Sequence, residues 1–448
     1  MQLSTRKMLD RSFSGLGVFS IALVAAALLV ILAPIAVRGV GAFVFRGTVE
    51  YRRMRLEKFG RGDAREVQNE CARAEKAREP VYRMIHQFEQ EMKGMGLAQR
   101  RQYAAPVEEL KQRVRELLGP PPGAARPALI RHQYGQTRWD RTQVKLFHAL
   151  HIEEYDYSNS TKLGVKVHRS RVEEFNGTSL EALFPYLEKN IDRLMLPRWT
   201  FYWRFLTDES KDIHFFGGIW PEVLGTFYLT IGAMLFAIPM GVIAAIYLVE
   251  YAGEGRVISL LRTCNSTLAG VPSIVFGLFG LAFFINTIHV SDSKSVLAGS
   301  LTLAVLVLPI VIRASEEAVL AVPQTYKEAA LSLGAGKWRT IVTVVLPAAL
   351  PGILTGTVIS MGRAAGETAP IIFTAAWSVG KPLTLVQTLS QGTPALPWNI
   401  YNLCTEHEAV DEIRHVQYGM VLTLVGLVLL LNVTAILLRA RVARKLRG

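Results

Sequence analysis

Charged residues are scarce in this 448-residue sequence, at 19% of the chain against about 25% in an ordinary soluble protein. Cysteine is scarcer still: three residues without a CxxC pair exclude a disulfide scaffold and a CxxC-type zinc or redox site. Half of the residues are hydrophobic, which excludes a disordered chain. The length exceeds one domain of roughly 100–200 residues. Because charged residues are scarce, the stretches that lack them entirely are the informative part of the sequence.

Six stretches contain no aspartate, glutamate, lysine or arginine: residues 12–37, 223–249, 263–291, 295–312, 340–362 and 415–438. A membrane-crossing helix needs about 20 mostly apolar residues, because the hydrocarbon layer is about 30 Å thick and a helix rises about 1.5 Å per residue. The sequence therefore predicts an all-α polytopic membrane protein with six transmembrane helices. The first is expected to be a retained signal anchor, since Arg38 follows it without a small-residue cleavage site.

Lysine and arginine mark both chain ends, at Arg6, Lys7 and Arg11 and again within residues 439–447. Positive charge in short loops favours the cytoplasmic side, so both termini are expected in the cytoplasm, which six spans allow. Residues 313–339 then lie inside as well. The net charge of +13 follows from this topology and from a basic insert. The expected surroundings are a lipid bilayer, and nucleic acid is not an expected partner.

A long polar insert separates the first two apolar windows. Apolar residues recur in it at helical spacing twice, as Val81, Ile85, Phe88 and Met92 and as Val107, Leu110, Val114 and Leu117. Glycines at 94 and 96 separate these two helices, the run 119–123 with three prolines ends the second, and Leu163, Val165 and Val167 predict a short strand. We expect an extracytoplasmic α+β domain at residues 41–212, between a first helix at 1–40 and a core of five further transmembrane helices at 213–448.

Two polar features of the outer segments have an ordinary interpretation. His148 and His151 stand near Glu153, but a metal site needs a further well-spaced ligand, so we expect a polar surface with no metal and no cofactor. Cys71 and Cys404 would share one oxidising compartment, and the sequence does not decide whether they pair.

The stretch around residues 323–347 predicts a compact cytoplasmic knob. Pro323 suits a helix start, and Glu328 to Leu333 is good helix material. Gly334 is expected to end that helix, because positive φ is cheap for glycine alone. Ala329 and Ala330 would let a partner surface approach closely.

This stretch resembles the signature loop of ABC importer permeases: Glu-Ala-Ala, three residues, Gly, nine residues, then an aliphatic residue, any residue and Leu-Pro. The matching positions are Glu328, Ala329, Ala330, Gly334, Val344, Leu346 and Pro347. The resemblance implies the ABC importer permease fold and a loop that docks on a separate ATPase. The run 334–337 lacks the first glycine and the Ser or Thr of a phosphate-binding loop, so ATP is expected on a partner and this chain is not expected to be an enzyme.

Arg363 and Glu367 follow, one helical turn apart, at the end of the fifth apolar window. If that span starts near Pro351, Arg363 lies about 18 Å deeper. A charge there costs about 2.5–3.5 kcal/mol and indicates function, and a planar guanidinium suits a tetrahedral oxyanion. The alternative is a structural ion pair that locks two helices. Arg313 is either a second anion contact or a positive-inside anchor.

Residues 362–375 (GRAAGETAPIIFTA) and 308–313 (LPIVIR) resemble the PstA branch of the phosphate importer permeases. The resemblance covers about residues 197–441 and the first span, and the long insert departs from it. It implies phosphate as substrate, with Arg363, Glu367, Thr368 and Arg313 on the anion path. It also implies four partners in a bacterial inner membrane: a PstC-type permease, two ATPase subunits and an extracytoplasmic phosphate-binding protein.

The residues alone support only an anion as substrate. A permease for another oxyanion, such as sulfate, molybdate or phosphonate, is therefore the alternative. A secondary transporter and a membrane-anchored sensor are the remaining classes of protein.

Overall fold

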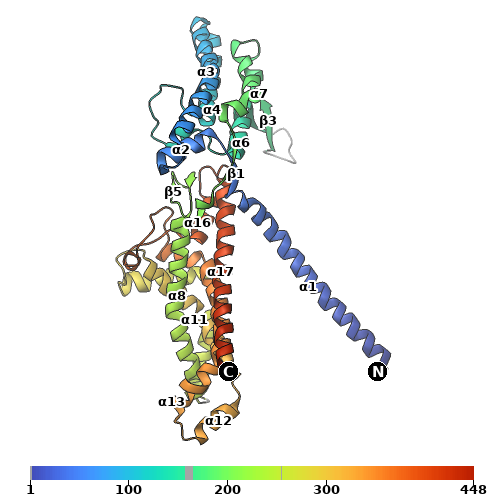
Figure 1. Ribbon diagram of the computed structural model, residues 1–448, viewed down its shortest axis with the longest axis vertical. Coiled ribbons are helices and arrows are strands. Elements are labelled where there is room, and N and C mark those ends of the chain that lie inside the picture. The colour runs from blue at the N-terminus through green and yellow to red at the C-terminus, as the bar shows by residue number, and fades with distance from the viewer. Residues whose placement is uncertain (1–2, 157–164, 254, 448) are drawn as a thin grey trace. The chain divides into compact units, whose positions relative to one another are not determined.

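The computed structural model describes residues 3–156, 165–253 and 255–447, so the predicted strand residue Leu163 lies outside the described residues. The chain forms two compact units (Figure 1). The helical unit comprises Met1–Val40 and Arg204–Gly448, and the insert unit comprises Gly41–Trp203. Each is described below by itself.

The helical unit consists of helices with one short hairpin. Its long helices are α1 (Leu3–Val40), α8 (Trp220–Ile246), α11 (Val296–Leu320), α14 (Leu346–Gly366) and α17 (Arg414–Arg447). Its shorter helices are α9 (Arg256–Ala269), α10 (Ser273–Gly280), α12 (Gln324–Ser332), α13 (Lys337–Thr340), α15 (Ala369–Thr374) and α16 (Leu396–Thr405). Three π-helical stretches extend them, η4 (Tyr247–Tyr251), η5 (Leu281–Thr287) and η6 (Ile341–Val345). The 3₁₀ turns η3 (Trp203–Leu206) and η7 (Gln387–Leu389) and the strands β5 (Ser210–Lys211) and β6 (Phe216–Gly217) complete it.

Among the described residues, five helical stretches are long and apolar enough to cross a membrane: Ser12–Val40, Trp220–Tyr251, Val296–Leu320, Lys337–Gly366 and Arg414–Arg441. The window 263–291, predicted as one span, is interrupted instead, because Arg256–Ala269 and Ser273–Thr287 meet at 103°. The break contains Pro272, which has no amide hydrogen and whose ring clashes with a preceding helical turn. The helical unit therefore has five candidate spans, or six if the bent pair is one.

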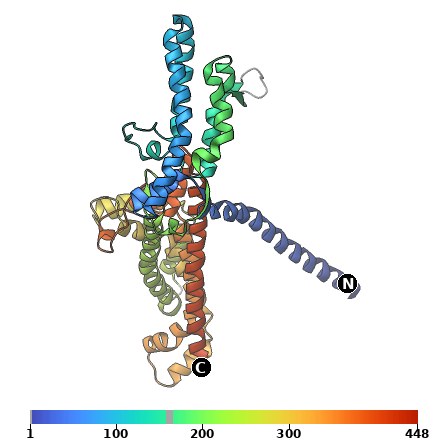
Figure 2. The same cartoon turned by 45° about the horizontal axis from the view of Figure 1, so that its top comes forward.

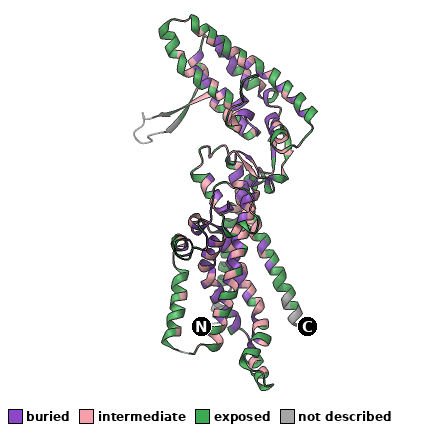
Figure 3. Ribbon diagram, turned by 90° about the vertical axis from the view of Figure 1, so that its left-hand side faces the viewer, coloured by how far each residue is buried: buried purple, intermediate pink, exposed green. Residues whose placement is uncertain are grey.

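Glycines let α8, α11 and α14 pack closely. A Cβ added to Gly232 or Gly241 of α8 would lie 2.3 Å from Ser300 or 2.6 Å from Val311 of α11. On α14, an added Cβ at Gly356 would lie 2.3 Å from the Cβ of Ala314. Small residues at such spacing allow helix backbones to approach within a membrane. The buried residues, purple in Figure 3, accordingly gather where these helices face one another.

The insert unit is built mainly on three helices, α3 (Ala64–Gly94), α4 (Leu97–Leu118) and α7 (Leu183–Met195), which bury one apolar core. Its other helices are α2 (Val49–Phe59), α5 (Ile130–Tyr134) and α6 (Trp139–Leu150), with 3₁₀ turns η1 (Arg171–Phe175) and η2 (Ser179–Ala182). Two antiparallel pairs of strands join them: β1 (Val44–Gly47) with β4 (Arg198–Phe201), and β2 (His151–Asp156) with β3 (Val165–Ser170).

The two amphipathic helices predicted for the insert are confirmed by α3 and α4, and the break between them falls at Met95 and Gly96 as expected. The glycine–proline stop is also confirmed. Helix α4 ends at Leu118, and Gly119 leaves the helix with a φ of 86°, which only glycine adopts without strain.

Candidate functional site

The predicted knob forms at one end of the helical unit, where α12 and α13 (residues 324–340) lie beyond the long helices (Figures 1 and 2). Helix α12 ends as predicted, since Gly334 has a φ of 81°. The amide of Gly334 donates to the carbonyl of Leu331 and that of Ala335 to the carbonyl of Ala330. These two bonds are the Schellman arrangement that ends helices at glycine.

The knob presents apolar and small side chains to its surroundings. Leu333 is 89% exposed and Trp338 is 68% exposed, and Glu328 and Ala329 are exposed beside them. Ala330 is half-buried. An exposed apolar patch with a polar rim is typical of an interaction surface.

Buried side chains hold the base of the knob on the long helices. Val345 of η6 and Ala349 of α14 pack with Val319 and Val322 at the end of α11. Leu346 and Pro347, the last residues of the predicted motif, lie half-buried at the start of α14. The motif thus combines an exposed tip with an anchored return to the helix bundle.

Two cations link the knob to the end of α8. The Nζ of Lys327 lies 2.5 Å from Oε1 of Glu250, and the two side chains are only 14% and 12% exposed. The Nζ of Lys337 lies 4.8 Å from the ring centre of Tyr251. Sequence reasoning missed both contacts. Lys327 and Glu250 are 77 positions apart, Lys337 and Tyr251 are farther apart still, and such separations leave no local pattern.

Arg363 and Glu367 meet as predicted, with Nε of the arginine 3.2 Å from Oε1 of the glutamate. Their side chains are 43% and 20% exposed. The apolar helical stretch that contains this pair runs from Lys337 to Gly366, and α14 accommodates Pro351 in its interior. Arg363 lies in the last turn of α14.

The other two predicted anion-path residues take no part in that ion pair. Thr368 stands with Glu367 in the break between α14 and α15. Arg313 pairs with Glu317 one turn further along α11, at 3.6 Å, and both side chains are 72% exposed. The structure thus brings Arg363 and Glu367 together, and it gives Arg313 a different partner.

A buried polar cluster joins the β5–β6 hairpin, the start of α8 and α16. Nε2 of His214 lies 2.8 Å from Oε1 of Glu222, which also accepts a hydrogen bond from Nδ2 of Asn399 at 3.1 Å. His214 and Glu222 are almost completely buried. The cluster holds three elements together at one end of the helical unit. Sequence reasoning missed it, because Glu222 marked only the edge of an apolar window.

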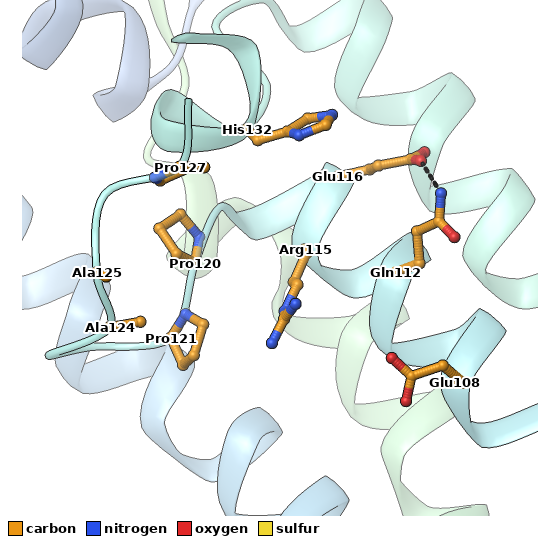
Figure 4. A pocket seen from close by; sticks show the side chains of 10 residues that line it. All are labelled: Glu108, Gln112, Arg115, Glu116, Pro120, Pro121, Ala124, Ala125, Pro127 and His132. Atoms are coloured by element: carbon orange, nitrogen blue, oxygen red, sulfur yellow. Dashed lines mark hydrogen bonds between the residues drawn. The ribbon is translucent and has the colours of Figure 1, made fainter. Parts of the chain in front are cut away.

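The insert unit contains a cavity of about 410 Å³ between α4 and the proline-rich segment that follows it (Figure 4). Arg115, Glu116 and His132 point toward it, with Gln112 donating to Glu116 at 3.3 Å. This lining mixes both charges without a nucleophile. Among the described residues, no three His, Cys, Asp or Glu side chains gather as a metal site, and Cys71, Cys264 and Cys404 are free thiols.

The long apolar helices and the exposed knob define a helical protein of the membrane-spanning class. A family model described as "Binding-protein-dependent transport system inner membrane component" matches residues 237–448. The probable ABC transporter permease protein YqgI of Bacillus subtilis (strain 168) is 34% identical over 252 residues, which cover 54% of this chain and 85% of that relative.

The phosphate transport system permease protein PstA 1 of Mycobacterium tuberculosis (strain ATCC 25618 / H37Rv) is 36% identical over 249 residues, covering 56% of this chain and 77% of the relative. An inward-facing structure of the MetNI methionine ABC transporter aligns at 19% identity and a TM-score of 0.38, over 50% of this chain and 94% of that one. The chain belongs to the family of binding-protein-dependent transport system inner membrane components, and within it to the PstA-type permeases.

Proposed function

We propose that this chain is the transmembrane permease subunit of an ATP-driven phosphate importer. The observation that carries the proposal is the kinship with phosphate transport system permease proteins named PstA, one of which is covered over 77% of its length at 36% identity. The chain changes no covalent bond, and ATP is hydrolysed on a partner ATPase.

The proposed topology has six spans in a bacterial inner membrane, with the bent pair α9–α10 and η5 counted as one. Both termini and the knob then lie in the cytoplasm, as the basic residues at the two chain ends favour. The insert, with proposed bounds 41–212, lies outside as an α+β domain. It separates the first helix, residues 1–40, from the core at 213–448.

The knob is the proposed docking element for the ATPase. Its exposed Leu333 and Trp338 supply apolar contact area, and Glu328, Ala329 and Ala330 shape the surface beside them. ATP binding closes the ATPase dimer and moves the knob, and the spans then open outward to accept phosphate from an extracytoplasmic binding protein. A PstC-type permease completes the translocation path.

Arg363, Glu367, Thr368 and Arg313 are the proposed anion contacts. Arg363 is 43% exposed in the isolated subunit, so its guanidinium is available to a second permease or to a passing anion. Glu367 neutralises it at rest, and a transiting oxyanion can take over the same hydrogen bonds.

Phosphate uptake by the purified complex in vesicles tests the proposal. Arg363→Ala is expected to abolish most uptake, and Arg363→Lys to retain charge but lose the two-pronged hydrogen bonding. Unchanged uptake by Arg363→Ala would reject the anion contact. Competition by sulfate, molybdate or phosphonate as strong as that by phosphate would favour the alternative oxyanions.

A further inference from the structure

Within the insert unit, taken by itself, the two-stranded sheet β1–β4 has one face with exposed apolar side chains. Val44 lies opposite Phe201 and Arg46 opposite Trp199 in the antiparallel register. Because side chains alternate along a strand, these four share one face. Trp199 is 75% exposed, Phe201 is 69% exposed and Val44 is 40% exposed.

On the opposite face of the same sheet, Phe45 is packed against the insert unit. Phe45 is 6% exposed, and the guanidinium of Arg138 lies 3.9 Å from its ring centre. The ring of Tyr51 meets it edge-on at 5.1 Å. A shift of register by one residue would exchange the two faces, so this packing fixes which side chains point outward.

The sheet follows a candidate span directly. Strand β1 begins at Val44, four residues after α1 ends at Val40, and four residues reach at most about 14 Å. Beyond β4, the chain enters α8, the next long apolar helix, at Trp220. The polar headgroup zone on each side of the hydrocarbon is several ångströms thick, so a strand so close to a span starts within or beside that zone.

We propose that the face formed by Val44, Trp199 and Phe201 inserts into the membrane–water interface and anchors the insert to lipid. The proposal assumes that α1 spans the bilayer, as in the proposed function. Tryptophan is enriched at this depth, because its ring is apolar and its N–H is polar.

Charge on the same face fits a lipid surface. The side chain of Arg46 is 40% exposed, and its only ion pair in the described chain is a loose one of 3.9 Å to Asp192. Its guanidinium lies 4.8 Å from the ring centre of Trp139, where it can also reach a lipid phosphate. An arginine beside exposed aromatic rings matches the phosphate and carbonyl layers of the interface.

The anchor gives the insert a fixed face toward the membrane. With it, three apolar side chains and one cation orient the insert, so that its other surfaces point toward the aqueous side.

Tryptophan fluorescence of the full transporter in vesicles tests the anchor. The chain has seven tryptophans, so the signal of Trp199 is taken as the difference between wild type and Trp199→Phe. Trp338, which is 68% exposed in the knob, provides the matched control through Trp338→Phe. Both side chains are exposed in this subunit, so neither substitution removes a residue from its core. Trp338 belongs to the proposed docking surface, so this control is measured by fluorescence and not by uptake.

In vesicles of phosphatidylcholine brominated high on the acyl chain, the Trp199 component is expected to lose a larger fraction of its intensity than the Trp338 component. Equal or smaller quenching of Trp199 would overturn the anchor, whether water or another protein covers that face. Phosphate uptake by the same vesicles separates the two ideas, because uptake without quenching would reject the anchor alone.

Discussion

Replacing Lys327 by methionine removes one partner of the ion pair that links the knob to the end of α8. Glu250 would then keep its charge in a site where its side chain is only 12% exposed. If the knob transmits force from an ATPase, this link is one of the contacts through which its movement reaches α8. Because α8 packs along α11 through Gly232 and Gly241, a loosened link is expected to weaken transmission to both helices.

The size of the effect follows from burial. Removing one partner of a fully buried pair costs about 3–5 kcal/mol, whereas an exposed pair contributes at most about 1 kcal/mol. The side chains of Lys327 and Glu250 are 14% and 12% exposed. We therefore expect the substitution to destabilise the linked state by about 2–3 kcal/mol, between these limits. At about 1.4 kcal/mol per factor of ten, the linked state would lose roughly 30- to 140-fold in population relative to the unlinked state.

The assay compares phosphate uptake with ATP hydrolysis by the same purified complex in vesicles. Lys327→Met and Glu250→Gln are each expected to lower the phosphate moved per ATP hydrolysed. The exchange Lys327→Glu with Glu250→Lys restores opposite charges and should recover part of that ratio. Asp411→Asn is the matched control, because the ion pair of Asp411 with Arg414 is 73% and 64% exposed and should contribute little.

Two results would refute this reasoning. Single variants that keep the wild-type ratio would show that the link does not transmit movement. A charge exchange that performs no better than the single variants, in complexes that still contain the ATPase, would show that the attraction between the two side chains is not the cause.

Three further predictions concern single residues. Gly334→Ala should destabilise the knob by about 1–2 kcal/mol, because φ is 81° there, and should reduce copurification of the ATPase. Gly336→Ala is the control: this residue has an ordinary φ and open space around it, so copurification should be unchanged. Gly356→Ala places a Cβ 2.3 Å from a side chain of α11 and should destabilise the protein by about 1–3 kcal/mol in thermal unfolding, whereas Gly362→Ala meets its nearest atom at 3.6 Å and should be nearly neutral. Arg78→Leu should destabilise the insert by about 3–5 kcal/mol, because it leaves its buried ion-pair partner Glu50 unpaired. Burial already raises the pKa of Glu50 against the opposing effect of Arg78, so this acid takes up a proton more readily in the folded chain than in the unfolded one. The difference in free energy of unfolding between wild type and Arg78→Leu should therefore shrink as the pH falls. Unfolding measured across pH would contradict this if that difference stayed constant.

Local features of this protein were readable from the sequence. The charge-free windows predicted the five long apolar helices, because lipid tolerates few charges over the length of a span. The glycine at 334 predicted the end of α12, since the left-handed conformation is a property of one residue. The amphipathic periods at residues 81–92 and 107–117 predicted α3 and α4, because residues that share one face of a helix are close together in the sequence.

Features that depend on partners distant in the chain were decided by the tertiary structure. The pairing of Lys327 with Glu250, the cluster of His214 with Glu222 and Asn399, and the register of β1 with β4 join segments whose separation leaves no periodic signal. The bend between α9 and α10 belongs here too, because a proline in an apolar run is compatible with both a kinked span and a break. The sequence by itself determined which segments are apolar and where glycine ends α4 and α12, since solvation and backbone conformation are local. Only the packing of the folded chain decided which side chains meet, because that choice is made by the free energy of the whole arrangement.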